Sequence, residues 1–314
     1  MATIHPTTSN LKNLTSTNTL ITSGSSGIGL ATALLLSSLS PSNKTYILNI
    51  HPPPSNLDLP SLRIHYHYCD ITNWHSQRAA FAAARQHFNG RIDAVFVNAG
   101  IAETGDQFFN NELDAQGELA EPNRRTLKLD VDAACDTVKL AIWHMRKNPL
   151  PAGEEGCRGR IVMMASLAGY LASAGAPYYS AAKHAIVGLM RALKREVAAL
   201  KMAISVVAPG ITDTPILVQE RAGGKTGAQH AAEMKGRGVP VNKAESVALA
   251  VCWLCDAGME GNGKGLLVQA DRVADLEVGI AKGRELWMGR EMLELFRGGR
   301  DKDVFEMRAK ETKL

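Results

Sequence analysis

A glycine-rich turn near the start of the chain limits its fold more than any other feature. It separates a short apolar run, 19–22, from a stretch of helical periodicity, 28–38, and contains Gly24, Gly27 and Gly29. Glycines let the backbone approach a phosphate, and a helix N-terminus offers free N–H groups and a positive dipole end. Alone, the stretch also fits a flexible Gly/Ser loop. We favour a strand–turn–helix unit that binds a nucleotide.

Strand-like and helix-like patterns alternate along the chain. The predicted strands are 19–22, 45–50, 62–68, 92–97, 160–165, 203–207 and 265–269. The predicted helices lie near 28–38, 74–88, 125–147, 178–200 and 243–257. This alternation is typical of a parallel sheet with right-handed crossovers and helices on both faces. We therefore predict the α/β class: a single domain with a doubly wound parallel sheet of about seven strands and a C-terminal helical extension.

A serine, a tyrosine and a lysine have a spacing that suits proton transfer. Tyr179 and Lys183 are four residues apart in a predicted helix, so they project from the same face. An ammonium beside a phenol favours the deprotonated phenol, which can then exchange a proton near neutral pH. Ser166 follows a predicted strand and adds a second hydrogen-bonding group. Tyrosine and lysine at this spacing are often plain surface neighbours, so the pattern gains weight only from the upstream turn.

Five motifs, in order and at matching spacing, resemble the short-chain dehydrogenase/reductase family over about residues 18–270. The family's T-G-x-x-x-G-x-G reads here as Thr22-Ser23-Gly24-Ser25-Ser26-Gly27-Ile28-Gly29, and its N-N-A-G as Val97-Asn98-Ala99-Gly100. Its catalytic serine matches Ser166, its Y-x-x-x-K matches Tyr179 and Lys183, and its P-G-x-x-x-T matches Pro209, Gly210 and Thr214. The stretches NAGIAE, GLMRAL and WMG look most like fungal members related to hydroxyprostaglandin-dehydrogenase-like enzymes.

The resemblance implies a Rossmann-like fold and an NAD(P)-dependent oxidoreductase that interconverts a secondary alcohol and a ketone. Tyr179 would be the general acid/base, Lys183 would assist it and bind the nicotinamide ribose, and Ser166 would hold the substrate oxygen. The predicted cofactor-binding residues are Ser23, Gly24, Ser25, Gly27, Ile28, Gly29, Asn49, Asp70, Ile71, Asn98, Ala99, Gly100, Tyr179, Lys183, Pro209, Gly210, Ile211 and Thr214. No metal is predicted. A helix cap for Asp70 and a turn residue for Asn98 are the structural alternatives.

Three positions depart from the family pattern. Ser23 replaces the first glycine, so either Ser23 adopts a left-handed φ at about 1 kcal/mol or Gly24 makes the turn instead. Asn49 replaces an acid that would repel a 2′-phosphate, so the choice between NAD and NADP stays open. Asp130 replaces the tetrad asparagine; we expect it to hold Lys183 as ammonium and to alter the pH profile modestly.

The resemblance also divides the chain. It predicts an N-terminal extension, 1–17, read as solvated; a catalytic domain, 18–270, whose mobile substrate loop is 213–240; and a helical tail, 271–314. The apolar residues of the tail would cover the pocket or a partner subunit, or pack on the core edge. Apolar positions in the helices 125–147 and 178–200 would pair across a two-fold axis in a homodimer or homotetramer.

Composition narrows the setting of the protein. The net charge is only +4 and basic residues are dispersed, which argues against nucleic acid or an anionic membrane as the main partner. No apolar run reaches the roughly 18 residues that span a bilayer. The odd number of cysteines, 5, favours reduced thiols in the cytoplasm. We read Cys252 and Cys255 as buried thiols rather than a metal or redox pair.

The expected partner is a small, mainly apolar substrate. That expectation comes from residues placed near the pocket mouth, namely Met163, Met164, Tyr170, Leu171 and Tyr178. Two other functions remain open: a cofactor-binding scaffold or sensor that has lost its chemistry, and an enzyme that uses the bound cofactor to organise a non-redox reaction.

Overall fold

A nine-stranded sheet forms the centre of the computed structural model, which describes residues 2–150, 156–219 and 227–298. The strand order is β1-β9-β8-β7-β6-β5-β2-β3-β4, and β2 to β8 run parallel. The strands are β1 (Ala2–Ile4), β2 (Asn18–Thr22), β3 (Lys44–Asn49), β4 (Ile64–Tyr68), β5 (Ala94–Val97), β6 (Gly159–Met164), β7 (Met202–Pro209), β8 (Gly265–Gln269) and β9 (Arg272–Asp275).

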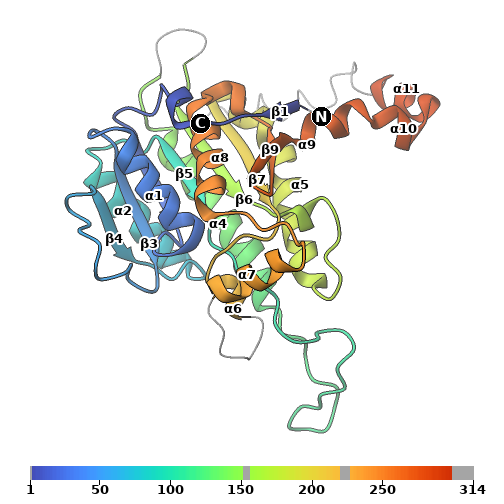
Figure 1. Cartoon of the computed structure of the whole chain (residues 1–314). Coiled ribbons are helices and arrows are strands. Elements are labelled where there is room, and N and C mark those ends of the chain that lie inside the picture. The colour runs from blue at the N-terminus through green and yellow to red at the C-terminus, as the bar shows by residue number, and fades with distance from the viewer. Residues whose placement is uncertain (1, 151–155, 220–226, 299–314) are drawn as a thin grey trace.

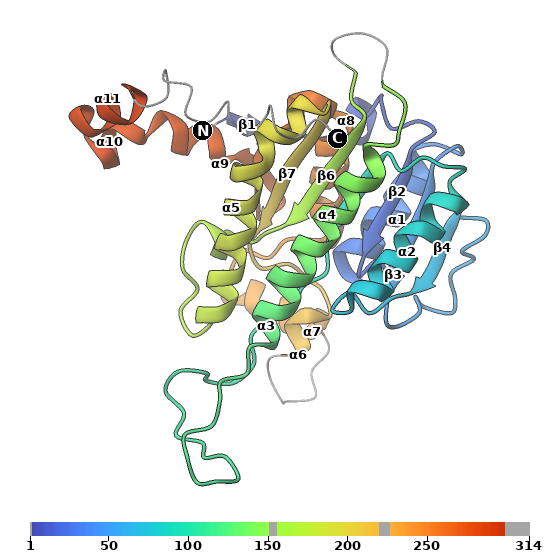
Figure 2. The ribbon, with the colours of Figure 1, turned by 180° about the vertical axis from the view of Figure 1, so that it is seen from behind.

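Helices cover both faces of the sheet. Figure 1 shows α1 (Gly27–Leu39) and α8 (Ala244–Asp256) on one face, and Figure 2 shows α2 (Trp74–His87), α4 (Ala134–Met145) and α5 (Pro177–Ala199) on the other. The shorter helices are η1 (Thr8–Asn10), α3 (Arg125–Leu127), η2 (Lys128–Ala133), η3 (Leu167–Gly169), α6 (Ile216–Gln219), α7 (Gly227–Gly236), η4 (Gly258–Gly261), α9 (Leu276–Lys282), α10 (Arg284–Met288) and α11 (Arg290–Gly298). No helix of the described ranges is long and apolar enough to cross a bilayer.

The central strands are buried on both faces because helices lie above and below them. Every residue of β5 and β7 is buried, as expected for parallel strands between two helical layers. Side chains alternate between two cores: Val95 and Ile161 face the α2–α4–α5 layer, whereas Phe96 and Val162 face the α1–α8 layer. The predicted fold class is confirmed, and each of the seven predicted strands corresponds to one strand from β2 to β8.

The N-terminal extension is packed against the domain rather than solvated. Its β1 pairs antiparallel with β9, and Leu11 and Leu14 are buried in the core. The prediction of a solvated extension is therefore wrong for these residues. Apolar side chains at positions 4, 11 and 14 explain the packing, since each meets the α1–α8 core.

Two segments project from the body. The connection between β5 and α3 extends away from it, and α9 to α11 lead out from the sheet edge beside β1 (Figures 1 and 2). The tail begins with strand β9 before its helices start. Leu286 and Trp287 are largely exposed, whereas Leu293 is buried. Residues 299–314 of the predicted tail and 220–226 of the predicted substrate loop lie outside the described residues.

Candidate active site

The turn between β2 and α1 has the backbone shape that the sequence left open. Ser23 has a φ of 53°, so the serine itself adopts the left-handed conformation, at about 1 kcal/mol. Gly24 has no positive φ, and the alternative in which it makes the turn is wrong. Gly24 is required for space, since a Cβ there would lie 2.5 Å from Ile47 Cγ2.

This turn fits a pyrophosphate. Helix α1 starts there, and within the described residues its N-cap, Ser26, makes no side-chain cap hydrogen bond. The N–H groups of a helix's first turn have no partner within the helix, so a ligand could accept from them. Ser25 Oγ is buried and lacks a hydrogen-bond partner within the described residues. At Gly29 a Cβ would lie 2.6 Å from Ser23 O, so only glycine lets the helix start this close. Unpaired donors and a backbone free of side chains are what a dinucleotide phosphate needs.

The end of β5 is tied to this turn. Asn98 Nδ2 donates to Thr22 O and Ser23 O, both at 3.1 Å, and the N–H groups of Asn98 and Ala99 donate to Thr22 Oγ1. The Asn98 side chain thus holds the glycine-rich turn against β5, which is compatible with the structural alternative of a turn residue and leaves its predicted cofactor contact as a prediction.

Ser166 follows β6 at the same edge of the sheet. Its Oγ accepts from the N–H of Ala168 at 3.1 Å and donates to Pro209 O at 3.5 Å, so it joins the ends of β6 and β7. The next helix, η3, lies directly on α5: a Cβ on Gly169 would be 2.5 Å from Lys183 O. Ser166 is therefore fixed beside the helix that carries Tyr179.

A buried ion pair lies behind Tyr179. Lys183 Nζ is 2.8 Å from Asp130 Oδ2, and both side chains are almost entirely shielded from water. Lys183 Nζ also donates to Met164 O at 3.4 Å and lies 5.3 Å from the centroid of the Tyr179 ring. At Gly100 a Cβ would lie 3.0 Å from that Nζ and 3.2 Å from Asp130 Oδ2, so the backbone of Gly100 packs closely against the pair.

A π-helical turn delivers Asp130 to this pair. The sequence predicts one continuous helix, 125–147, but the structure has η2 as a π-helix between α3 and α4. π-Turns insert an extra residue and re-aim the side chains around them, often at functional sites. Asp130 lies in η2, and its Oδ1 accepts from the N–H of Ile101 at 2.8 Å. The carboxylate thereby joins α5 to the end of β5.

The electrostatics of the pair keep Lys183 charged. Burial acts to lower the pKa of Lys183. Three influences raise it: the charge of the Asp130 carboxylate, the Tyr179 phenol and the hydrogen bond to Asp130. Together they outweigh burial, so the pKa is raised. An ammonium beside Tyr179 is therefore maintained throughout the neutral range.

The remaining predicted cofactor residues lie along the same sheet edge. The Pro209–Thr214 segment contacts the glycine-rich turn, since a Cβ on Gly27 would be 3.3 Å from Thr214 Cγ2. Ile211 is anchored by Asn242, whose N–H donates to Ile211 O at 2.8 Å. Ile28 follows Gly27 in the first turn of α1.

Asn49 is the last residue of β3, and Asp70 and Ile71 follow β4. Asp70 Oδ1 accepts from the N–H and Oγ of Thr72 at 2.9 and 2.7 Å, which closes a turn. Asn73, not Asp70, caps α2, so the helix-cap alternative for Asp70 is wrong. Asn49 Oδ1 accepts a long hydrogen bond, 3.3 Å, from the N–H of His51.

Some residues have places that the sequence did not indicate. Tyr170 was expected at the pocket mouth, but its hydroxyl donates to Glu277 at 2.9 Å, and a Cβ on Gly265 would collide with it. It therefore belongs to the interface between α5 and the tail. Glu103 was missed: its Oε2 accepts from the N–H of Tyr179 at 2.9 Å. Its position shortly after the Asn98–Gly100 motif, beyond Ile101 and Ala102, is the signal that could have identified it.

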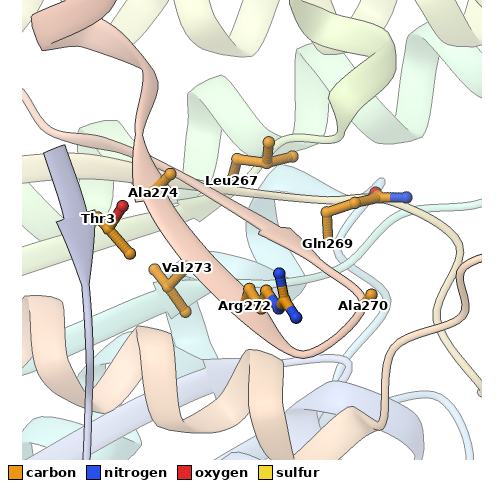
Figure 3. Close-up of a pocket in the computed structure, with 7 residues that line it drawn as sticks. All are labelled: Thr3, Leu267, Gln269, Ala270, Arg272, Val273 and Ala274. Atoms are coloured by element: carbon orange, nitrogen blue, oxygen red, sulfur yellow. The ribbon is translucent and has the colours of Figure 1, made fainter. Parts of the chain in front are cut away.

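A shallow cavity of about 520 Å³ is lined by residues other than the predicted site residues. Figure 3 shows it between β1, β8 and β9, lined by Thr3, Leu267, Gln269, Ala270, Arg272, Val273 and Ala274. None of the predicted catalytic residues lines it. Cys252 and Cys255 are buried free thiols, as predicted, and burial raises the pKa of Cys255 to about 12.

Comparison with known proteins assigns the family. Residues 17–224 match the family model described as short chain dehydrogenase. The chain belongs to the short-chain dehydrogenase/reductase family. It is 30% identical over 287 residues to the short-chain dehydrogenase/reductase prx4 of Penicillium roqueforti, covering 86% of this chain and 79% of the relative. As a family member it is an oxidoreductase, and such enzymes typically use NAD(P).

Further relatives agree with this short-chain dehydrogenase/reductase assignment. The 5′-hydroxyaverantin dehydrogenase of Dothistroma septosporum is 26% identical over 312 residues, covering 93% of this chain and 95% of the relative. A solved short-chain type dehydrogenase/reductase from Mycobacterium marinum has a TM-score of 0.68 at 19% identity, covering 84% of this chain and 98% of that one. At that identity the likeness shows the fold alone.

Proposed function

We propose that this protein interconverts a secondary alcohol and a ketone, with Tyr179 as general acid/base assisted by Lys183 and Ser166. The observation that carries the proposal is the buried Lys183–Asp130 pair behind Tyr179, at the sheet edge that also carries the nucleotide-type turn. A lysine held as ammonium beside a phenol favours proton release from the phenol.

In the proposed reaction each side chain has a separate task. Tyr179 gives a proton to, or takes one from, the substrate oxygen. Ser166 Oγ holds that oxygen beside the phenol, and Lys183 stabilises the phenolate electrostatically. Asp130 keeps Lys183 charged and in place. The nicotinamide supplies or accepts the hydride when the cofactor is bound, so the protein contributes position, charge and proton transfer.

The cofactor is NAD or NADP in this proposal. Ser23, Gly24, Ser25 and Gly27 to Gly29 would hold its phosphates, Asp70, Ile71 and Asn98 to Gly100 its adenosine half, and Pro209 to Thr214 its nicotinamide. Asn49 lies where discrimination at the 2′ position is expected, and its neutral amide neither repels nor attracts a phosphate strongly.

The substrate class and setting extend the same proposal. We take the substrate to be a mainly apolar small molecule of the secondary-metabolite kind, because Met164 and Tyr178 are partly exposed near the site. Pairing through α4 and α5 would give a homodimer or homotetramer, supported by Trp143 on α4, which is 57% exposed. All five cysteines are free thiols, which supports the cytoplasm as its location.

The test is an absorbance assay for reduced nicotinamide with a panel of ketones and secondary alcohols and with both cofactors. We expect Tyr179→Phe to lower kcat by about 10²–10⁴-fold while cofactor affinity is retained. Tyr178→Phe is the matched control and should keep its activity. Cofactor binding without turnover of any substrate would instead favour a scaffold or sensor.

A further inference from the structure

The first turn of α5 lacks a cap of its own. Its N-cap residue, Ala176, has no side-chain oxygen, and the turn contains no acidic residue. The first N–H groups of a helix have no partner within it, and acids normally stabilise that positively polarised end. Tyr179 is the third residue of this helix, after Pro177 and Tyr178. The proposed acid/base therefore lies in the part of the helix that frays most easily.

Glu103 supplies the missing cap from 76 residues away. Its Oε2 accepts from the N–H of Tyr179 at 2.9 Å, and its charge lies at the positive end of the helix dipole. Phe108 adds a second contact from the same segment, since its ring lies 5.0 Å from that of Tyr178, centroid to centroid. One segment thus holds two successive residues of the turn.

The same segment also contacts the buried ion pair. Gly100 lies against Lys183 Nζ, and the N–H of Ile101 donates to Asp130 Oδ1 at 2.8 Å. Three of the four residues 100–103, namely Gly100, Ile101 and Glu103, therefore contact Lys183, Asp130 or the backbone of Tyr179.

The second carboxylate oxygen indicates that this arrangement is not there for stability alone. Glu103 Oε1 is buried and has no hydrogen-bond partner among the described residues. A buried polar atom left unpaired typically costs about 1–3 kcal/mol. An apolar residue would avoid that penalty, so stability alone does not account for side-chain oxygens at this position.

We propose that Glu103 is a positioning residue for Tyr179: its carboxylate caps α5 from the β5 loop and sets where the phenol stands relative to Ser166 and the cofactor. This inference rests on the proposed function.

Two substitutions separate this role from general stability. Glu103→Ala removes the cap, and we expect kcat to fall about 10–100-fold while the cofactor dissociation constant stays within about twofold. Glu103→Gln keeps an oxygen that accepts the same N–H, and we expect it to stay within about threefold of the wild type. Glu112→Ala, in the exposed part of the same segment, is the matched control and should be unchanged.

Amide hydrogen exchange provides a readout that does not need turnover. In Glu103→Ala we expect exchange at residues 179–181 to accelerate at least tenfold, with β7 unchanged. If Glu103→Ala does not fold, Glu103→Asp, which withdraws the carboxylate by one methylene, replaces it and should show a smaller change of the same kind.

The proposal is overturned if Glu103→Ala keeps the kcat of the wild type, or if Glu103→Gln loses as much activity as Glu103→Ala. Equal acceleration of exchange in α5 and β7 would also overturn it. If the wild type itself turns over no substrate, the proposed function fails, and exchange in the first turn of α5 still decides whether Glu103 holds that turn.

Discussion

Asp130 carries a charge with almost no access to water, and its cation partner is equally shielded. Removing one member of such a pair leaves a buried charge alone, which typically costs 3–5 kcal/mol. We expect Asp130→Ala to lower the free energy of unfolding by about that amount, measured by chemical denaturation. Surface changes usually stay within about 0.5 kcal/mol, so Glu118→Ala is a suitable control. A loss for Asp130→Ala as small as the control's would argue against the pair.

The same pair predicts a pH effect. The folded-state pKa of Lys183 is raised, so the stabilisation by the pair is complete below lysine's ordinary pKa of about 10.4 and is lost as pH rises through the raised value. In Asp130→Asn the main raising influence is absent, so the pKa of Lys183 falls. We expect activity to persist and the alkaline decline of kcat/KM to move to lower pH. An unchanged profile would remove Asp130 from the mechanism.

Asn49 predicts how cofactor preference can be shifted. A carboxylate at this position would repel a 2′-phosphate and still accept a hydrogen bond from a 2′-hydroxyl. We expect Asn49→Asp to raise the ratio of NAD to NADP affinity by about tenfold, measured by calorimetry. Asn56→Asp makes the same substitution in an exposed loop and should leave the ratio unchanged. Equal shifts in both variants would indicate only a general charge effect.

Among the elements, the N-terminal segment gives the clearest stability test. Leu14 is 1% exposed, and large-to-small changes at such sites typically cost 2–5 kcal/mol. We expect Leu14→Ala to lower the free energy of unfolding by about 2–4 kcal/mol, whereas Leu119→Ala, at a residue 70% exposed, should change it by less than about 0.5 kcal/mol. Similar small values for both would mean that the segment is solvated in solution.

The elements also show what the sequence can and cannot predict. Most strands from β2 to β8 could be predicted because they are short, largely apolar runs between turn residues, and β4 because aromatic residues and histidines alternate along it. β1 could not be predicted, because three residues are too few to show a periodic pattern. Its pairing partner, β9, also lies far away in the sequence. The π-turn at Asp130 has no signal in the local sequence, and the partner of its carboxylate, Lys183, is distant along the chain. The candidate site residues could be predicted from the spacing of their motifs. Glu103 could not, because it acts through a hydrogen bond from the backbone of Tyr179, which is distant in sequence.

At the scale of the whole molecule, Trp143 tests the proposed assembly. A charge at the centre of an apolar interface disfavours association because it must be desolvated. We expect Trp143→Glu to convert the homodimer or homotetramer to smaller species, measured by light scattering after size exclusion. Trp287→Glu, on the projecting α10, is the comparison variant. If it alone causes dissociation, the tail rather than α4 carries the contact.

The pairing of β1 with β9 has a consequence for handling the protein. Without residues 2–4, β9 would be an edge strand whose unpaired backbone N–H and C=O groups face solvent. Such exposed edges pair with strands of other molecules. Protein that lacks these N-terminal residues should therefore aggregate as it is concentrated, even though every proposed catalytic and cofactor-binding residue is still present.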